Sequence, residues 1–203
     1  ATFETASAAK LVSADGKTVF GEQANGVPSQ SGPFRWTQAE GKVDLRDELG
    51  KVLNGHRTIE AVSDDGSVVV GFEHKLWELA YRWTKEEGPV PLGGLKTTGH
   101  LSGARPGSVA GTSGDGSLIV GSLDFYGDPA PYIWDPIDGV RLLQTVLRDY
   151  GVDLKGWHLS GVAAISRDGR TIIGEAERLG DYSSWLAYSS DAWGTIIVPE
   201  SSS

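Results

Sequence analysis

The sequence predicts an all-β protein, a β-propeller of four four-stranded blades, from two observations. The motif Ser-x-Asp-Gly occurs four times in 203 residues, with Ser-to-Ser spacings of 50, 50 and 53 residues. Each copy lies between two short apolar runs, the second of which ends in Gly, and a Trp follows each Ser by 19 to 23 residues. Repeats of about 40 to 50 residues with four short strands each are typical of propeller blades.

Each motif predicts a tight hairpin, because Asp-Gly tolerates the positive φ angles that a two-residue turn requires. In this interpretation Asp and Gly build the turn, and the Ser hydroxyl hydrogen-bonds its backbone. A calcium loop would require more oxygen ligands at alternating positions. The four copies comprise Ser13, Asp15 and Gly16, then Ser63, Asp65 and Gly66, then Ser113, Asp115 and Gly116, and lastly Ser166, Asp168 and Gly169.

Four strands are expected in each repeat, because four apolar segments of strand length alternate with turn residues. The first strands are expected at residues 8–12, 58–62, 108–112 and 161–165. The second strands are expected at residues 18–22, 67–72, 118–123 and 171–176. The third are expected at residues 33–37, 80–84, 131–135 and 184–188, and the fourth at 42–45, 89–92, 140–143 and 195–198.

Each third strand carries a Trp, which we expect to pack one blade against the next rather than to stack on a ligand. These residues are Trp36, Trp83, Trp134 and Trp185. One short helix is expected near residues 142–150, where Leu143, Val146 and Leu147 follow helical spacing and Gly151 can end the helix.

The repeats predict one four-bladed propeller-like domain over residues 1–203. Their expected bounds are approximately 8–57, 58–107, 108–158 and 159–198, followed by a disordered tail at 199–203. A closed ring of four blades fits this length best, with residues 1–6 free to pair across the seam. Two chains joined as half-rings and a piece of a longer array are the alternatives.

Composition narrows the possible partners. The 18 basic and 27 acidic residues give a net charge of −9, which disfavours binding to nucleic-acid phosphates and to anionic membranes. The chain has no Cys, which excludes disulfides and thiolate metal sites. Its apolar runs are too short to span a bilayer. It begins at Ala1 without a signal-like segment, which indicates a processed form or a fragment.

The second repeat carries the pattern small-x-Ser-x-Asp-Gly-x-x-Val-Val-Gly at residues 61–71, followed by Tyr-Arg-Trp-Thr at 81–84. Residues 34–37 repeat the second part as Phe-Arg-Trp-Thr. With these motifs the sequence resembles the extracellular HAF-repeat family, β-rich units of secreted and surface proteins of Gram-negative bacteria, including autotransporter passenger regions. The resemblance covers nearly the whole chain, although copies three and four depart from the Arg-Trp-Thr box. It implies an extracellular or cell-surface location and no particular reaction.

The sequence contains none of the usual catalytic motifs. No two of the four His residues have metal-ligand spacing, and there is no nucleophile elbow, phosphate loop or dinucleotide fingerprint. We therefore expect no catalytic residue, no metal and no cofactor.

The connections between second and third strands vary in length and content, and such loops on a rigid scaffold commonly carry function. We expect their aromatic and charged residues to form the binding site. The alternative is that Trp77 and Phe125 pack onto the adjoining blade. The candidates are His74, Trp77, Phe125, Tyr126, Arg178 and Tyr182.

These observations predict a non-enzymatic extracellular binding or adhesion module with its ligand on the variable-loop face. The expected partner is a glycan or a host or surface protein, and the expected state is a monomer or a homodimer. One alternative is a structural spacer or dimerising half-propeller of a surface or autotransporter passenger. The other is an extracellular polysaccharide hydrolase that uses two carboxylates.

Overall fold

The computed structural model describes residues 7–23, 31–45, 57–74, 78–95, 104–124, 130–178, 180–188 and 195–197. Their strands form four antiparallel sheets, and the strands of each sheet follow one another in chain order. The prediction of an all-β protein is confirmed, and the sheets have the four-stranded layout of propeller blades. We refer to the sheets as blades 1 to 4.

The strands of blade 1 are β1 (Ser7–Val12), β2 (Thr18–Gln23), β3 (Gly32–Thr37) and β4 (Gly41–Asp44). Those of blade 2 are β5 (Arg57–Val62), β6 (Val69–His74), β7 (Glu78–Thr84) and β8 (Gly88–Pro91). Blade 3 contains β9 (Arg105–Pro106), β10 (Gly111–Thr112), β11 (Ile119–Asp124), β12 (Ala130–Asp135) and β13 (Gly139–Leu142). Blade 4 contains β14 (His158–Ile165), β15 (Thr171–Arg178), β16 (Asp181–Tyr188) and β17 (Thr195–Ile197).

The first strand of blade 3 differs from the continuous strand expected at residues 108–112. It is split into β9 and β10, which both pair with β11. Pro106 has no N–H to donate, and the next two amides, of Gly107 and Ser108, both donate to the Ser122 carbonyl. The helix forms where the sequence predicts it, as α1 (Leu143–Asp149) between blades 3 and 4.

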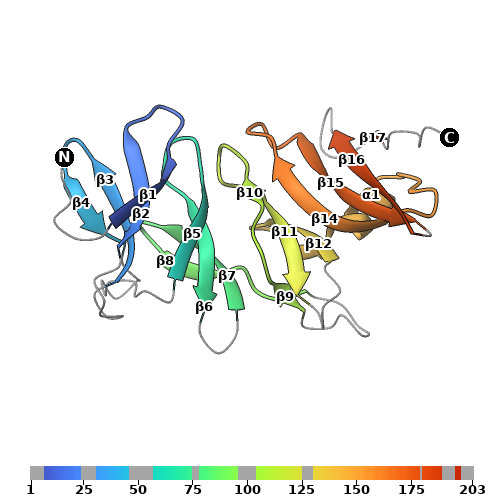
Figure 1. Ribbon diagram of the computed structural model, residues 1–203, viewed down its shortest axis with the longest axis horizontal. Helices are drawn as coiled ribbons and strands as arrows, with labels where there is room; N and C mark the ends of the chain where they lie inside the picture. Colours follow the sequence, from blue (N-terminus) through green and yellow to red (C-terminus); the bar gives the residue numbers. More distant parts are fainter. Residues whose placement is uncertain are drawn as a thin grey trace.

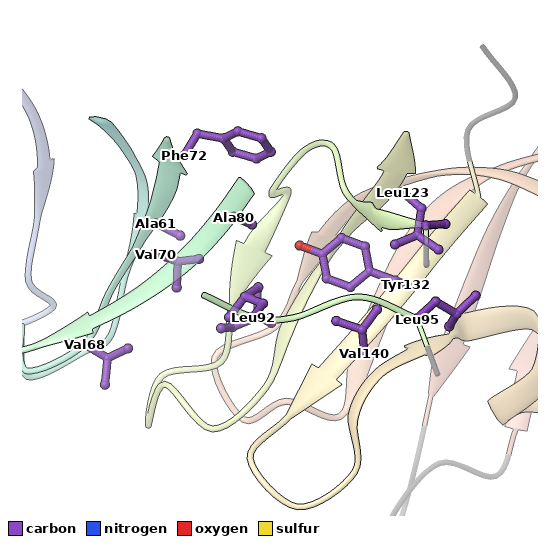
Figure 2. Packing of buried hydrophobic residues seen from close by; sticks show 12 residues of the cluster. Ala61, Val68, Val70, Phe72, Ala80, Leu92, Leu95, Leu123, Tyr132 and Val140 are labelled. Carbon is purple, nitrogen blue, oxygen red and sulfur yellow. The ribbon is translucent and has the colours of Figure 1, made fainter. Parts of the chain in front are cut away.

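Three apolar clusters hold successive blades together. Phe20 of blade 1 packs with Ile59 and Val69 of blade 2. Figure 2 shows the next cluster, in which Val70 and Phe72 of blade 2 lie across from residues of blade 3 such as Tyr132 and Leu123. Blades 3 and 4 meet through Val120, Ile133, Ile172 and Trp185, together with Leu143, Val146 and Leu147 of α1. The middle strands of blades 2 and 3 are therefore buried on both faces, as in stacked blades.

A chain of backbone hydrogen bonds also links the blades, at the Ser-x-Asp-Gly turns. The Ala14 amide donates to the Asp64 carbonyl (2.8 Å), and the Asp64 amide donates to the Gly114 carbonyl (2.7 Å). The Gly114 amide donates to the Arg167 carbonyl (2.6 Å). The blades follow one another along the long axis of the molecule, with blade 1 and blade 4 at opposite ends (Figure 1). Over the described residues, no backbone hydrogen bond joins the turn of blade 4 to that of blade 1.

A glycine in the second strand of every blade has no room for a side chain. A Cβ on Gly71 would lie 1.9 Å from the Thr58 carbonyl oxygen and within 2.8 Å of the Tyr81 side chain. Gly21, Gly121 and Gly174 have the same surroundings, with a backbone carbonyl on one side and an aromatic ring of the third strand on the other. The carbonyl belongs to the first strand in blades 1 and 4, and to Ser108, between β9 and β10, in blade 3. The rings belong to Phe34, Tyr81, Tyr132 and Trp185.

This register corrects the alignment of the Trp residues. Trp36, Trp83 and Trp134 lie opposite Val19, Val69 and Ile119, two residues before the strand glycine. Ala187 occupies the matching position in blade 4, opposite Ile172. Trp185 instead takes the place of Phe34, Tyr81 and Tyr132, two residues earlier on its strand. The spacing from the Ser did not distinguish the two positions because the connecting loops differ in length.

Candidate functional site

The Ser-x-Asp-Gly turns are closed by their own side chains. In blade 2, the Ser63 hydroxyl donates to the Asp65 carboxylate (2.7 Å) and accepts from the Val68 amide (2.9 Å). The same carboxylate oxygen accepts the Ser67 amide (2.9 Å). Equivalent bonds form at Ser13 and Asp15, at Ser113 and Asp115, and at Ser166 and Asp168.

The turn differs from the two-residue turn that the sequence predicts. The Ser63 amide donates to the Val68 carbonyl and the Gly66 amide to the Ser63 carbonyl, so the loop is longer. Only its Gly has a positive φ, +71° at Gly66, whereas Asp65 does not. The Asp is therefore required as a hydrogen-bond acceptor rather than for its tolerance of positive φ.

These hydrogen bonds lower the pKa values of the turn carboxyl groups. The Lys17 amide and then the Ser13 hydroxyl lower the pKa of Asp15 to about 2. The pKa of Asp65 is lowered first by the Ser67 amide, and the pKa of Asp115 first by the Ser113 hydroxyl. The Ser166 hydroxyl has the same effect on the pKa of Asp168. The carboxylates are thus engaged within their own turns, as the structural interpretation of the motif expects.

The sequence-predicted binding residues that the structure describes, His74, Arg178 and Tyr182, lie at the opposite ends of the strands from these turns. Trp77, Phe125 and Tyr126 fall outside the described residues, and His74 is the last residue of β6. Arg178 and Tyr182 flank the β15–β16 connection of blade 4. The described part of the candidate site is therefore the loop end of blade 4.

Arg178 packs on Trp157. Its guanidinium lies over the indole ring, 4.7 Å from the ring centroid, and it also lies 3.5 Å from the Lys155 carbonyl oxygen. Trp157 is buried in the cluster between blades 3 and 4. This arrangement is a cation–π contact that covers the edge of the core. Arg178 thus has a packing role.

Tyr182 lies in a different environment, with 75% of its surface exposed. It pairs with Glu177 on β15, and Glu177 pairs with His158 on β14. Directly paired residues of adjacent strands share a face, so these three side chains form a row across the sheet. We call His158, Glu177 and Tyr182 the blade 4 row.

The blade 4 row lies on the face of the sheet that points away from blade 3. On β15, Ile172, Gly174 and Ala176 are buried toward blade 3, whereas Ile173 and Glu175 between them are exposed. Glu177 is half-buried and lies on the same face as Ile173 and Glu175, because side chains alternate along a strand. The row combines an aromatic ring, a carboxylate acceptor and an imidazole. His158 and Glu177 were not among the sequence candidates, although strand alternation across three strands could have indicated them.

No group of three or more His, Asp or Glu side chains within the described residues could hold a metal ion. Within that same part of the chain, no helix is long and apolar enough to cross a membrane.

Comparisons with known proteins identify the fold. No family model and no curated protein matches the chain. It is similar to TolB from Acinetobacter baumannii, with 15% identity and a TM-score of 0.55 over 96% of this chain and 43% of that one. A putative TolB from Agrobacterium tumefaciens matches with 17% identity and a TM-score of 0.52, over 97% and 62% of the two chains.

A third match, with 14% identity and a TM-score of 0.57, comes from a structural study of two prolyl endopeptidases and covers 98% of this chain and 30% of that one. The chain thus spans less than two thirds of the length of each of these structures. Together with the four antiparallel sheets, these matches define the class: a β-propeller module. At such identities the likeness concerns the fold alone.

Proposed function

We propose that this propeller module is a non-enzymatic binding unit that takes a glycan on the blade 4 row. The observation that carries the proposal is the exposure of Tyr182, 75%, on a paired strand rather than on a free loop. An exposed aromatic ring held by a rigid sheet offers a stacking surface at low entropic cost.

The chemistry of the row supports a neutral sugar as the ligand. Glu177 lies next to the ring and His158 beyond it, and they add a hydrogen-bond acceptor and a group that both donates and accepts, which suits sugar hydroxyls. The net charge of −9 disfavours phosphate-rich or strongly anionic ligands.

A binding role is favoured over hydrolysis by the state of the carboxyl groups. A glycosidase needs a general acid whose pKa is raised. Among the described residues, every carboxyl group with a clear shift has its pKa lowered, as hydrogen bonds do for Asp15 and Asp65.

The proposed location is the bacterial cell surface or the extracellular medium. The HAF-repeat resemblance of residues 61–71 and 81–84 and the absence of Cys support it. Fractionation of the producing bacterium followed by immunoblotting tests it. The protein is expected in the surface or medium fraction, and recovery in the cytoplasm alone would contradict the proposal.

A glycan array probed with the purified chain tests the binding role. The expected result is binding to a defined set of sugars that Tyr182→Ala abolishes and Tyr182→Phe retains. Tyr150→Ala is the matched control, because Tyr150 is also exposed, 49%, but lies after α1. Binding that survives Tyr182→Ala, or an array without signal, would overturn the proposal.

A further inference from the structure

A carboxylate on the face of blade 4 that points away from blade 3 lacks the partners of its counterpart in blade 1. Glu22 follows the strand glycine of blade 1 and accepts two hydrogen bonds. One comes from the Lys10 ammonium group (2.8 Å) and the other from the Ile59 amide of blade 2 (3.0 Å). Glu175 follows the strand glycine of blade 4 in the same way, and it is exposed. The blade itself thus shows that a Glu at this position can hold an ammonium group.

One residue of the first strand accounts for the missing ammonium group. Lys10 is the extra residue of a β-bulge, directly after the residue that lies opposite the strand glycine. Ala163 occupies the same bulge in blade 4, directly after Val162, which lies opposite Gly174. An Ala side chain carries no donor. Within the described part of the chain, the Glu175 carboxylate has no hydrogen-bond or ion-pair partner. The open carboxylate therefore reflects a difference of sequence within the blade.

The surroundings of Glu175 are open and negatively charged. This residue pairs with Gly161 on β14 and with the exposed Ser184 on β16. Its Oε2 lies 4.0 Å from the position of a Cβ on Gly161, so the carboxylate lies over a residue without a side chain. Glu177 shares this face, and the described residues that pair with the two Glu residues include no Lys or Arg. A cation is therefore the ligand that this part of the sheet favours.

The open carboxylate is a neighbour of the blade 4 row. Residues two apart on a strand share a face and are separated by about 7 Å. Glu175 has this relationship to Glu177 on β15, and Ser184 has it to Tyr182 on β16. A glycan that stacks one unit on Tyr182 and runs along these strands therefore brings its next unit over Glu175 and Ser184.

We infer that Glu175 and Ser184 form a second subsite, which binds a sugar unit carrying a protonated amino group. The inference rests on the proposed function, because it takes the adjoining unit of the same glycan to lie on the blade 4 row. The amino group donates to the Glu175 carboxylate as the Lys10 ammonium group donates to Glu22. The Ser184 hydroxyl bonds a hydroxyl of the same unit. The ligand class is an oligosaccharide in which an amino sugar adjoins a neutral sugar.

Isothermal titration calorimetry with two matched probes tests the subsite. One probe is a trisaccharide of N-acetylglucosamine, and the other is the same trisaccharide with a free amino group on its central unit. At mildly acidic pH, where the amine carries its proton, we expect the second probe to bind about fivefold more tightly, as for an ion pair near a protein surface. This preference should weaken at high salt. Tyr182→Ala is expected to abolish the binding of both probes.

Two variants of blade 4 locate the amino group. Glu175→Gln removes the charge, and Ala163→Lys supplies an ammonium group at the position of Lys10. Both are expected to remove the preference and to keep the affinity for the fully acetylated probe. Glu60→Gln is the matched control, because Glu60 is exposed on the first strand of blade 2 and its replacement changes the net charge equally. It should keep the preference, and all three variants should have unchanged circular dichroism.

The outcomes separate this inference from the proposed function. Equal affinities of the wild type for the two probes, a preference that survives Glu175→Gln or Ala163→Lys, or binding of neither probe would overturn the inference. The proposed function would stand after any of these results if the glycan array still shows binding that depends on Tyr182. Binding of both probes that survives Tyr182→Ala would contradict the proposed function and the inference together.

Discussion

The indole ring of Trp185 lies directly against Gly174, the residue opposite it on the neighbouring strand. A Cβ on Gly174 would lie 2.4 Å from Cζ2 of the indole and 2.2 Å from the carbonyl oxygen of Gly161. The indole Nε1 donates to the Glu175 carbonyl (2.8 Å), which fixes the ring in this position. The other blades place Phe34, Tyr81 and Tyr132 against their own strand glycines. Each blade therefore requires a glycine at this position of its second strand, because any side chain there would overlap the ring of the third strand.

Gly174→Ala is therefore expected to lower the free energy of unfolding by about 3 kcal/mol, because the added methyl group overlaps backbone and a fixed ring. Gly161→Ala is the matched control. A Cβ there meets nothing closer than the Glu175 Cβ at 3.9 Å, and the expected change is within about 0.5 kcal/mol. Urea unfolding of both variants measures the difference. Equal stability of the two variants would contradict the role assigned to Gly174.

Ser63 supports the turn of blade 2 from a fully buried position. Ser63→Ala removes the hydroxyl that accepts from the Val68 amide and donates to Asp65. It is therefore expected to lower the free energy of unfolding by about 1 to 3 kcal/mol. Ser67→Ala is the control, because the Ser67 hydroxyl donates to the same carboxylate from an exposed position. Its loss is expected to lower the free energy of unfolding by less than about 0.5 kcal/mol. Thermal or urea unfolding compares the two. A smaller loss for Ser63→Ala than for Ser67→Ala would show that the motif Ser does not hold the turn.

The sequence could predict the blades because their strands are short, repeated and separated by turn residues. Fifty-residue spacing located the second, third and fourth strands closely, for example β8 (Gly88–Pro91) against an expected 89–92. It could not predict the split of β9 and β10, which depends on Pro106 and on two amides that share one carbonyl. It also could not assign Trp185 correctly, because the position of a ring relative to Gly174 is a property of strand register.

The candidate site was harder to predict, because an exposed loop residue and a packed one look alike in sequence. Arg178 and Tyr182 are four residues apart, yet the first lies over Trp157 and the second points to solvent. Their difference follows from strand alternation, which assigns them to opposite faces of blade 4 once the pairing of Glu177 with Tyr182 is known. His158 became a candidate only through that pairing.

Acid is expected to destabilise the turns. A carboxyl group whose pKa is lower in the folded than in the unfolded chain stabilises the fold above its unfolded pKa, about 3.9 for Asp. That contribution is lost as the pH falls through the folded-state pKa, which hydrogen bonds lower to about 2 for Asp15 and also lower for Asp65, Asp115 and Asp168. Urea unfolding should therefore show stability falling between pH 4 and pH 2.

Asp115→Asn tests the origin of this pH dependence. At pH 7 the variant is expected to have a free energy of unfolding about 1 kcal/mol below that of the wild type, because its neutral amide accepts the hydrogen bonds from Ser113 and Ser117 more weakly. On acidification its free energy of unfolding should fall less than that of the wild type. Asp138→Asn is the control, because its exposed carboxylate only pairs with Arg141. If both variants had the same pH profile as the wild type, the turn carboxylates would not be the titrating groups.

Stability measurements can separate packing from ligand contact at the loop end of blade 4. Arg178→Ala removes the cation–π contact with Trp157 and uncovers a buried ring, so it is expected to lower the free energy of unfolding by about 1 kcal/mol. Tyr182→Ala removes a side chain that is 75% exposed, and its expected effect is within about 0.5 kcal/mol. Urea unfolding monitored by circular dichroism measures both. A loss for Tyr182→Ala as large as that for Arg178→Ala would indicate that Tyr182 packs on the blade and is not available to a ligand.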